Sequence, residues 1–144
     1  MMPLMKTIQH IVEGKRVHCV DKAETVQRAC ERMAEHRIGA LVVLDGEQVV
    51  GIFTERDLLT RVVTVGLNVH ETRVGEAMSS RLIVTSPTET YAACLEKMQR
   101  GGFRHLPIVS EGRLMDIVSL RDLLLLEIDE EREEIEFLHE YISR

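Results

Sequence analysis

Two short segments of the chain combine a hydroxyl, an arginine and an aspartate in the same order and at the same spacing. The segments are Thr54, Arg56 and Asp57 in the first half, and Ser119, Arg121 and Asp122 in the second. A hydroxyl beside the free N–H groups at the start of a helix makes a phosphate site. A carboxylate one turn further on accepts hydrogen bonds from the paired hydroxyls of a ribose, and an arginine between them meets a phosphate. The alternative is two capped helix starts with dipole-complementing aspartates, and the residues alone do not decide between the two.

Both segments belong to an internal repeat. A shift of 65 residues aligns residues 20–60 with residues 85–125 without a gap. The longest identical run is Arg-Asp-Leu-Leu, at 56–59 and again at 121–124, and it mixes charged with apolar residues. The two halves therefore share more than a pattern of core positions.

Each half predicts a strand, a helix, two strands and a second helix. The first helices show apolar positions three and four residues apart, and the paired strands flank Asp-Gly or Glu-Gly turns that are typical of hairpins. A unit of about 50 residues has a marginal core, so we expect the two sheets to pack together. The strands are expected at 17–20, 41–44, 49–53, 82–85, 106–109 and 114–118. The first helices cover 26–33 and 91–98, capped by Thr25 and Thr90 or by the polar residues just before them, and the second helices begin near Thr54 and Ser119.

The pattern divides the chain into three parts. The first unit covers residues 7–65, the second unit covers 74–126, and an acidic segment follows at 127–144. Residues 66–72, between the units, are polar and include a glycine, as is typical of a linker.

The composition excludes several classes of protein. The chain has 144 residues, of which 44% are hydrophobic, so it is too apolar to be disordered. Its longest apolar run is far shorter than a membrane span, and residues 1–6 lack the apolar region of a secretory signal. The three cysteines form no C-x-x-C pair, and the six histidines show no metal-ligand spacing. We therefore expect a soluble cytoplasmic protein with reduced, buried cysteines, no bound metal and no membrane contact.

The formal charge of −6 comes entirely from the last segment. Residues 127–144 contain eight acidic and two basic residues, whereas residues 1–126 are neutral. A neutral body with an acidic tail argues against a nucleic-acid partner and is no obstacle to a small anionic ligand.

The acidic segment also has an apolar stripe. Ile128, Ile135 and Ile142 recur every seven residues, and the stripe is broadened by Phe137, Leu138 and Tyr141. The pattern predicts a helix with one apolar and one acidic face, and Glu131 interrupts the seam that a long coiled coil would need. We expect a terminal helix that packs on its own dimer. The alternative is a docking helix for a partner with a basic groove, and deleting residues 128–144 would separate the two.

These motifs resemble the cystathionine β-synthase (CBS) domain, and the tandem resembles a stand-alone CBS pair, or Bateman module, over residues 7–126. Residues 51–57 read Gly-Ile-Phe-Thr-Glu-Arg-Asp and match the family's Gly-hydrophobic-x-Thr/Ser-x-x-Asp motif. Residues 116–122 read Asp-Ile-Val-Ser-Leu-Arg-Asp and depart from it only in the first position. Residues 102–109 (Gly-Phe-Arg-His-Leu-Pro-Ile-Val) and 74–78 (Val-Gly-Glu-Ala-Met) look like parts of the second domain of such pairs.

The resemblance implies an α/β (α+β) fold in which two β-α-β-β-α domains form a pseudo-twofold pair with two clefts, followed here by the acidic helix. Each cleft would combine the motif of one domain with strand residues of the other, and adenine would lie against apolar residues and be read by backbone groups. One cleft would use Thr54, Arg56, Asp57, Ile83, Arg104, His105 and Leu106. The other would use Ser119, Arg121, Asp122, His18, Gly39, Ala40 and Leu41.

The two expected clefts differ in charge. Arg104 and His105 stand in the first where Gly39 and Ala40 stand in the second. Arginine offers a fork of donors to a phosphate, and histidine becomes charged near neutral pH. We therefore expect the Asp57 cleft to bind the more highly charged ligand. The Asp116 that replaces a motif glycine affects only the start of its strand.

The function that follows from the resemblance is ligand sensing. The chain is expected to bind AMP, ADP, ATP, NAD or S-adenosylmethionine, with no obligatory cofactor, and to signal to a protein target in trans. A homodimer through the domain helices is expected, with the apolar run 123–126 on that face. One alternative is a structural or dimerisation adaptor without a nucleotide. The other is an enzyme, for which the sequence offers no triad, metal cluster or carboxylate pair of adequate spacing.

Overall fold

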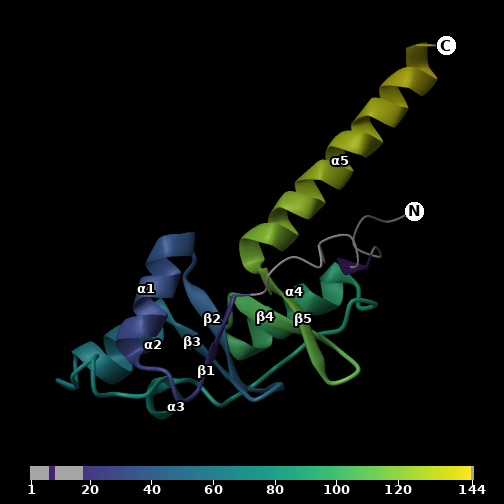
Figure 1. Cartoon of the computed structure of the whole chain (residues 1–144). Helices are drawn as coiled ribbons and strands as arrows, with labels where there is room; N and C mark the ends of the chain where they lie inside the picture. Colours follow the sequence, from purple (N-terminus) through teal and green to yellow (C-terminus); the bar gives the residue numbers. More distant parts are fainter. Residues whose placement is uncertain (1–6, 9–17, 144) are drawn as a thin grey trace.

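The computed structural model describes residues 7–8 and 18–143, and its helices and strands follow the repeat (Figure 1). The expectations placed on residues 1–6, on Val17 and on Arg144 lie outside the described residues. Among the residues that are described, the helices offer no segment with the length and hydropathy needed to cross a membrane.

The first half is a three-stranded sheet with a helix on it. The strands β1 (Cys19–Asp21), β2 (Ala40–Asp45) and β3 (Gln48–Thr54) lie in the order β1-β2-β3. The outer strand β1 is parallel to β2, and β2 is antiparallel to β3. Helix α1 (Val26–His36) begins at Thr25, whose Oγ1 accepts a hydrogen bond from the Arg28 N–H at 3.2 Å. The predicted cap at Thr25 is confirmed.

The second half repeats this arrangement with one strand fewer. Helix α4 (Tyr91–Gly101) is capped by Thr90, and β4 (His105–Ser110) pairs antiparallel with β5 (Arg113–Ser119). The strand expected at 82–85 is reduced to a single parallel bridge between Thr85 and Ile108. The cause is Pro107. In the first half the N–H of Val42 donates to the His18 carbonyl at 3.1 Å, and the equivalent Pro107 has no N–H to donate.

The second helices of the two halves differ most. In the first half, α2 (Glu55–Leu58) runs into a short π-helix, η3 (Leu59–Val63), and the chain then crosses to α3 (Val74–Ala77). In the second half, α5 (Leu120–Ser143) is one helix of 24 residues. It passes without a break from the last part of the repeat into the acidic segment, and it projects away from the body (Figure 1).

Each half has its own hydrophobic core. The first contains Val26, Leu41, Phe53 and Val62 among its buried members, and the second contains Tyr91, Leu106, Ile108 and Leu123. Ile8 is fully buried in the second core, and its N–H donates to the Glu89 carbonyl at 2.9 Å. The start of the described chain therefore packs on the second half, although it precedes the first half in sequence.

The chain that follows α3, residues 78–79, is called the linker from here on, and it is held to β3, the edge strand of the first sheet opposite β1. Ile52 and Ser79 exchange two backbone hydrogen bonds, of 3.0 and 2.9 Å. A Cβ on the adjacent Gly51 would lie 2.6 Å from the Ser79 carbonyl oxygen and 2.7 Å from the sulfur of Met78. Glycine at position 51 is therefore required by the approach of the linker backbone.

The second half departs from the motif at the same place for a matching reason. Asp116 is the equivalent of Gly51 in the repeat. Within the described part of the chain, β5 pairs only with β4. Position 116 therefore lies in a strand to which no described segment other than β4 pairs, and it accommodates a side chain.

Candidate functional site

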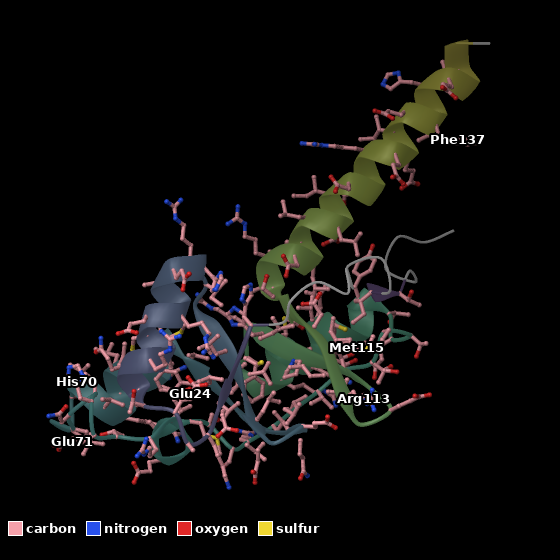
Figure 2. The ribbon with its side chains drawn as sticks, viewed as in Figure 1. Glu24, His70, Glu71, Arg113, Met115 and Phe137 are labelled. Carbon is pink, nitrogen blue, oxygen red and sulfur yellow. The ribbon has the colours of Figure 1, made fainter. Side chains whose placement is uncertain are left out.

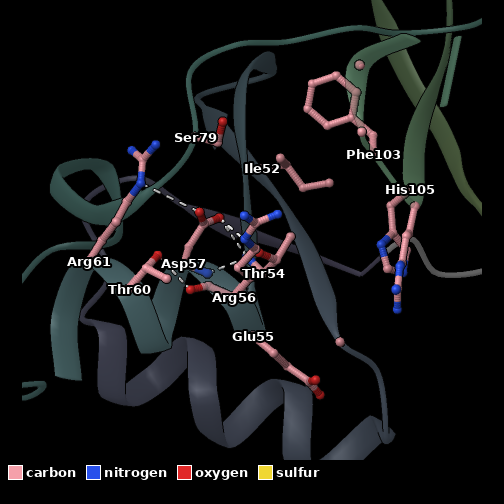
Figure 3. A pocket seen from close by; sticks show the side chains of 14 residues that line it. Ile52, Thr54, Glu55, Arg56, Asp57, Thr60, Arg61, Ser79, Phe103 and His105 are labelled. Carbon is pink, nitrogen blue, oxygen red and sulfur yellow. Dashed lines mark hydrogen bonds and ion pairs between the residues drawn. The ribbon is translucent and has the colours of Figure 1, made fainter. Parts of the chain in front are cut away.

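A cavity of about 730 Å³ lies between the two halves (Figure 3). The first half contributes the end of β3 and the helices α2 and η3, and the second contributes the segment that joins α4 to β4. The lining residues are Gly39, Ile52, Thr54, Glu55, Arg56, Asp57, Thr60, Arg61, Ser79, Gly101, Gly102, Phe103, Arg104 and His105. Five of the seven residues expected in the Asp57 cleft are among them.

Thr54 and Asp57 form a reciprocal cap at the start of α2. The Thr54 Oγ1 accepts from the Asp57 N–H at 3.2 Å, and the Asp57 Oδ2 accepts from the Thr54 N–H at 3.0 Å. The Thr54 hydroxyl also lies 3.1 Å from the same Oδ2. The capping interpretation of these residues is therefore correct, and it occupies only one carboxylate oxygen of Asp57.

The other oxygen of Asp57 is only loosely engaged. Its Oδ1 lies 3.7 Å from the Nε of Arg61, too far for a hydrogen bond, and the Arg61 side chain is 51% exposed. An ion pair of this exposure adds little stability. The Arg61 Nη1 instead donates to the Met78 carbonyl of the linker at 2.9 Å. Asp57 thus lines the cavity with an acceptor that a ligand hydroxyl can use without disturbing the cap.

Arginines supply the positive charge of the cavity. Arg56 and Arg61 come from the first half and Arg104 comes from the second, and all three are exposed. The negative side chains in the lining are Glu55 and Asp57. This combination suits an anion that also carries hydroxyl groups.

His105 lines the same cavity in a neutral state. Burial lowers the pKa of His105 below its usual 6.5, and Arg104 lowers it further, while Asp122 and Glu55 oppose the shift. The ring is therefore uncharged at pH 7, so it does not provide the positive charge that its sequence position predicted. It offers a ring nitrogen as a neutral donor or acceptor.

The neutral state of His105 in the folded chain predicts that the free energy of unfolding depends on pH. The unfolded chain takes up a proton at His105 near pH 6.5, before the folded chain does. The free energy of unfolding should therefore decrease as the pH falls below 6.5, and His105→Gln should remove part of that decrease. Urea unfolding at neutral and acidic pH measures it, with the exposed His70→Gln as control. An unchanged pH dependence in His105→Gln would contradict a buried neutral ring.

The second motif is built like the first. The Ser119 N–H donates to the Asp122 Oδ2 at 2.9 Å, and the Asp122 N–H donates to the Ser119 Oγ at 3.0 Å. The Leu120 N–H donates to the Arg104 carbonyl at 2.8 Å, as the Glu55 N–H does to the Gly39 carbonyl at 3.0 Å. The repeat therefore extends to the local hydrogen bonds.

The residues expected opposite this second motif lie in different places. Gly39 lines the Asp57 cavity, whereas Ala40 and Leu41 are buried in β2. The ring of His18 lies 4.7 Å from that of His36. Two residues expected in the first cleft are not in the cavity lining: Leu106 is fully buried, and Ile83 packs against the second core. Arg121 is exposed at the start of α5.

Sequence reasoning missed several lining residues. Arg61 lies four residues after Asp57, a helical spacing that would have placed both side chains on one face. Phe103 lies close to Gly101, where a Cβ would clash with its ring. Ser79 comes from the linker, and no local pattern marks it. Among the described residues, no three His, Cys, Asp or Glu side chains gather as a metal site.

Comparison with known sequences shows a match along most of the chain. The sequence profile of the CBS domain matches residues 9–64 and 74–129. The mitochondrial CBS domain-containing protein CBSX3 of Arabidopsis thaliana is 32% identical over 145 residues, which covers 97% of this chain and 70% of that protein. The chain spans about a fifth of the length of several other plant relatives.

Comparison with solved structures shows the same arrangement. A CBS-domain containing protein from Agrobacterium tumefaciens matches with a TM-score of 0.76 and 32% identity, over 83% of this chain and 97% of that one. A CBS domain protein from Pyrobaculum aerophilum, solved as a complex with AMP, matches with a TM-score of 0.74 over 81% of this chain and 89% of that one. At 23% identity the latter likeness concerns the fold.

Proposed function

The chain belongs to the CBS domain family as a tandem pair, and from that premise we propose that it is a regulatory module that binds an adenosine-containing nucleotide between its two domains. The observation that carries the proposal is the Asp57 cavity. It combines a carboxylate oxygen held only by a loose ion pair, a helix start and three arginines in one space between the halves. The Pyrobaculum protein, which has the same fold and was solved as a complex with AMP, supports this choice of ligand.

The geometry suggests how the nucleotide is oriented. The ribose hydroxyls donate to the Asp57 Oδ1 and the phosphates lie toward the arginines, because the cap leaves that oxygen without a strong partner. Since Arg56 and Arg104 approach from different halves, a phosphate between them contacts both domains. ADP, ATP and NAD, which carry more charge than adenosine, fit this cavity in preference to an uncharged nucleoside.

The proposed output is a change in association with a protein target. A ligand shifts a conformation only by its different affinity for two states, and a cavity shared by two domains provides that difference. Exposed apolar residues on η3, Leu59 and Val63, support a homodimer through the domain helices. The three free cysteines are in keeping with a cytoplasmic location. The proposal includes no catalytic step and no obligatory cofactor.

A panel of ligands tests the proposal by thermal melting. AMP, ADP, ATP, NAD and S-adenosylmethionine are added in turn, with adenosine as the uncharged control. A ligand present at about 100 times its Kd should add roughly 2.7 kcal/mol of stability. For a chain of this size that corresponds to a rise in Tm of about 5–10 °C. A Tm unmoved by every ligand would favour the alternative, an adaptor whose motif aspartates serve only as helix caps.

The arginine from the second half gives a sharper test. Arg104→Ala should weaken ATP binding by about 10- to 100-fold, because a hydrogen bond to a charged group is worth about 1.5–3 kcal/mol. It should weaken adenosine binding much less. Isothermal titration calorimetry measures both, with Arg113→Ala as the control, since Arg113 lies on the β4–β5 hairpin away from the cavity (Figure 2). Equal losses of affinity for ATP and for adenosine would mean that the phosphates do not bind at Arg104.

A further inference from the structure

The outer part of α5 is a helix with an uncovered apolar face. At its base, Leu123 and Leu126 pack against the second core. On the same turns Leu124, Leu125 and Ile128 are 45%, 48% and 44% exposed. Beyond them the helix leaves the body and runs into solvent (Figure 1). The apolar face therefore begins where the helix is anchored and continues along its free length.

The exposed residues follow a heptad. Taking Ile128 as position a, the a positions are Ile128, Ile135 and Ile142, and the d positions are Leu124, Glu131 and Leu138. Isoleucine at a with leucine at d favours a two-stranded parallel coiled coil. Ile135, Leu138 and Ile142 are 54%, 49% and 78% exposed, so the body of the same chain leaves the seam uncovered.

The charges beside the seam decide which partner fits. In a parallel pair, position g of one helix meets position e of the other, five residues further on. The g residues are Glu127 and Glu134, and the e residues that they meet are Arg132 and His139. The first contact joins opposite charges, and in the second the histidine ring can donate a hydrogen bond to the carboxylate. An antiparallel pair would bring g opposite g, so glutamate would face glutamate.

We propose that α5 of one chain pairs with α5 of a second copy in a short parallel coiled coil, with residues 124–142 as the paired segment. In a parallel pair, the residues beside the apolar positions of one helix are complementary to those of its copy. Asp129, Glu133, Glu136 and Glu140 lie at outer positions of the heptad, so the acidic residues that give the chain its net charge face solvent in the pair. The pairing does not depend on the nucleotide cavity.

Glu131 sets the strength of the pairing. It is the single charged residue at the a and d positions of 124–142, and in a parallel pair it faces its own copy. Two carboxylates in one layer repel, while Arg132 at the neighbouring e position lies next to the partner's d layer and offsets part of that repulsion. The result is a weak and reversible seam. Phe137 is 66% exposed at an outer position and has no place in this pairing (Figure 2).

Sedimentation equilibrium of the full chain measures the pairing. Glu131→Leu should tighten self-association by about tenfold or more, because it replaces a charged layer with a buried leucine pair. Ile135→Asp should weaken it by about tenfold or more for the opposite reason. Glu136→Gln, a charge change at an outer position, is the matched control. Equal association constants for Glu131→Leu, Ile135→Asp and the wild type would overturn the proposal.

Disulfide trapping distinguishes this seam from a dimer formed through the body. Leu138→Cys at a d position should give a cross-linked dimer on mild oxidation, and Glu140→Cys at an outer position should not. Circular dichroism of both variants verifies that they retain the helix, and the wild type gives the background from the three native cysteines. In an antiparallel pair Leu138 would not face its own copy. Absent cross-linking at 138, or equal cross-linking at 138 and 140, would overturn a parallel pair.

Discussion

Asp57→Asn should lower the affinity for an adenosine-containing nucleotide by about 10- to 100-fold, because a hydrogen bond to a charged group contributes about 1.5–3 kcal/mol. The substitution should weaken ligand binding while leaving the stability of the fold nearly unchanged. An asparagine oxygen can still accept from the Thr54 N–H, since asparagine and aspartate are both good capping residues. What is lost is the charge on the oxygen that faces the cavity. Calorimetric titration with AMP and ATP measures the loss.

Asp122→Asn is the matched control in the second half. Asp122 makes the same reciprocal cap with Ser119, so any cost of altering the cap itself appears in both variants. A loss of affinity confined to Asp57→Asn would assign the ribose to the cavity described above. Wild-type affinity in Asp57→Asn would leave Asp57 as a cap alone and would contradict the proposed binding mode.

Gly51→Val should destabilise the fold by about 2–3 kcal/mol, since overpacking a tightly filled site costs about that much. The new Cβ would lie 2.6 Å from the Ser79 carbonyl oxygen, and relief requires moving the linker and breaking its two hydrogen bonds to Ile52. For a chain of this length the Tm should fall by about 5–10 °C. Thermal melting followed by circular dichroism measures this change.

The equivalent variant in the second half, Asp116→Val, should change the Tm far less. β5 pairs only with β4 among the described residues, and position 116 already carries a Cβ, so valine adds none against a paired backbone. If the two variants were equally destabilised, the approach of the linker to β3 would not explain the glycine, because β5 has no such neighbour among the described residues. If neither were destabilised, the linker would not be held against β3 as described.

Much of the fold could be predicted from the sequence because its signals are local. The caps at Thr25 and Thr90, the hairpin turns and the helix starts after Thr54 and Ser119 each depend on a few neighbouring residues. Because the repeat shows the same signals in both halves, each predicted element is supported by two segments of the sequence. The strand at 82–85 could also have been discounted, because the missing N–H of Pro107 is visible in the sequence.

The remaining features depend on contacts between distant segments. Gly51 matched a motif, but the reason for a glycine lies in the linker that approaches from Ser79. Gly39 was expected in the second cleft alone, and its place in the lining of the Asp57 cavity depends on how the two halves pack. Ile8 carries no local sign that it completes the core of the second half. The neutral state of His105 likewise follows from burial, which the sequence does not display.

Because α5 is one continuous helix, a small rotation at its base would produce a larger displacement at its far end. Its 24 residues give a length of about 36 Å, so a tilt of about 5° at its base would move its tip by about 3 Å. The base of the helix is the capped turn formed by Ser119 and Asp122. Asp122 acts electrostatically on His105, which lines the cavity, so the base of α5 is coupled to the cavity. A displacement too small to change the shape of the cavity is therefore magnified at the far end of the helix.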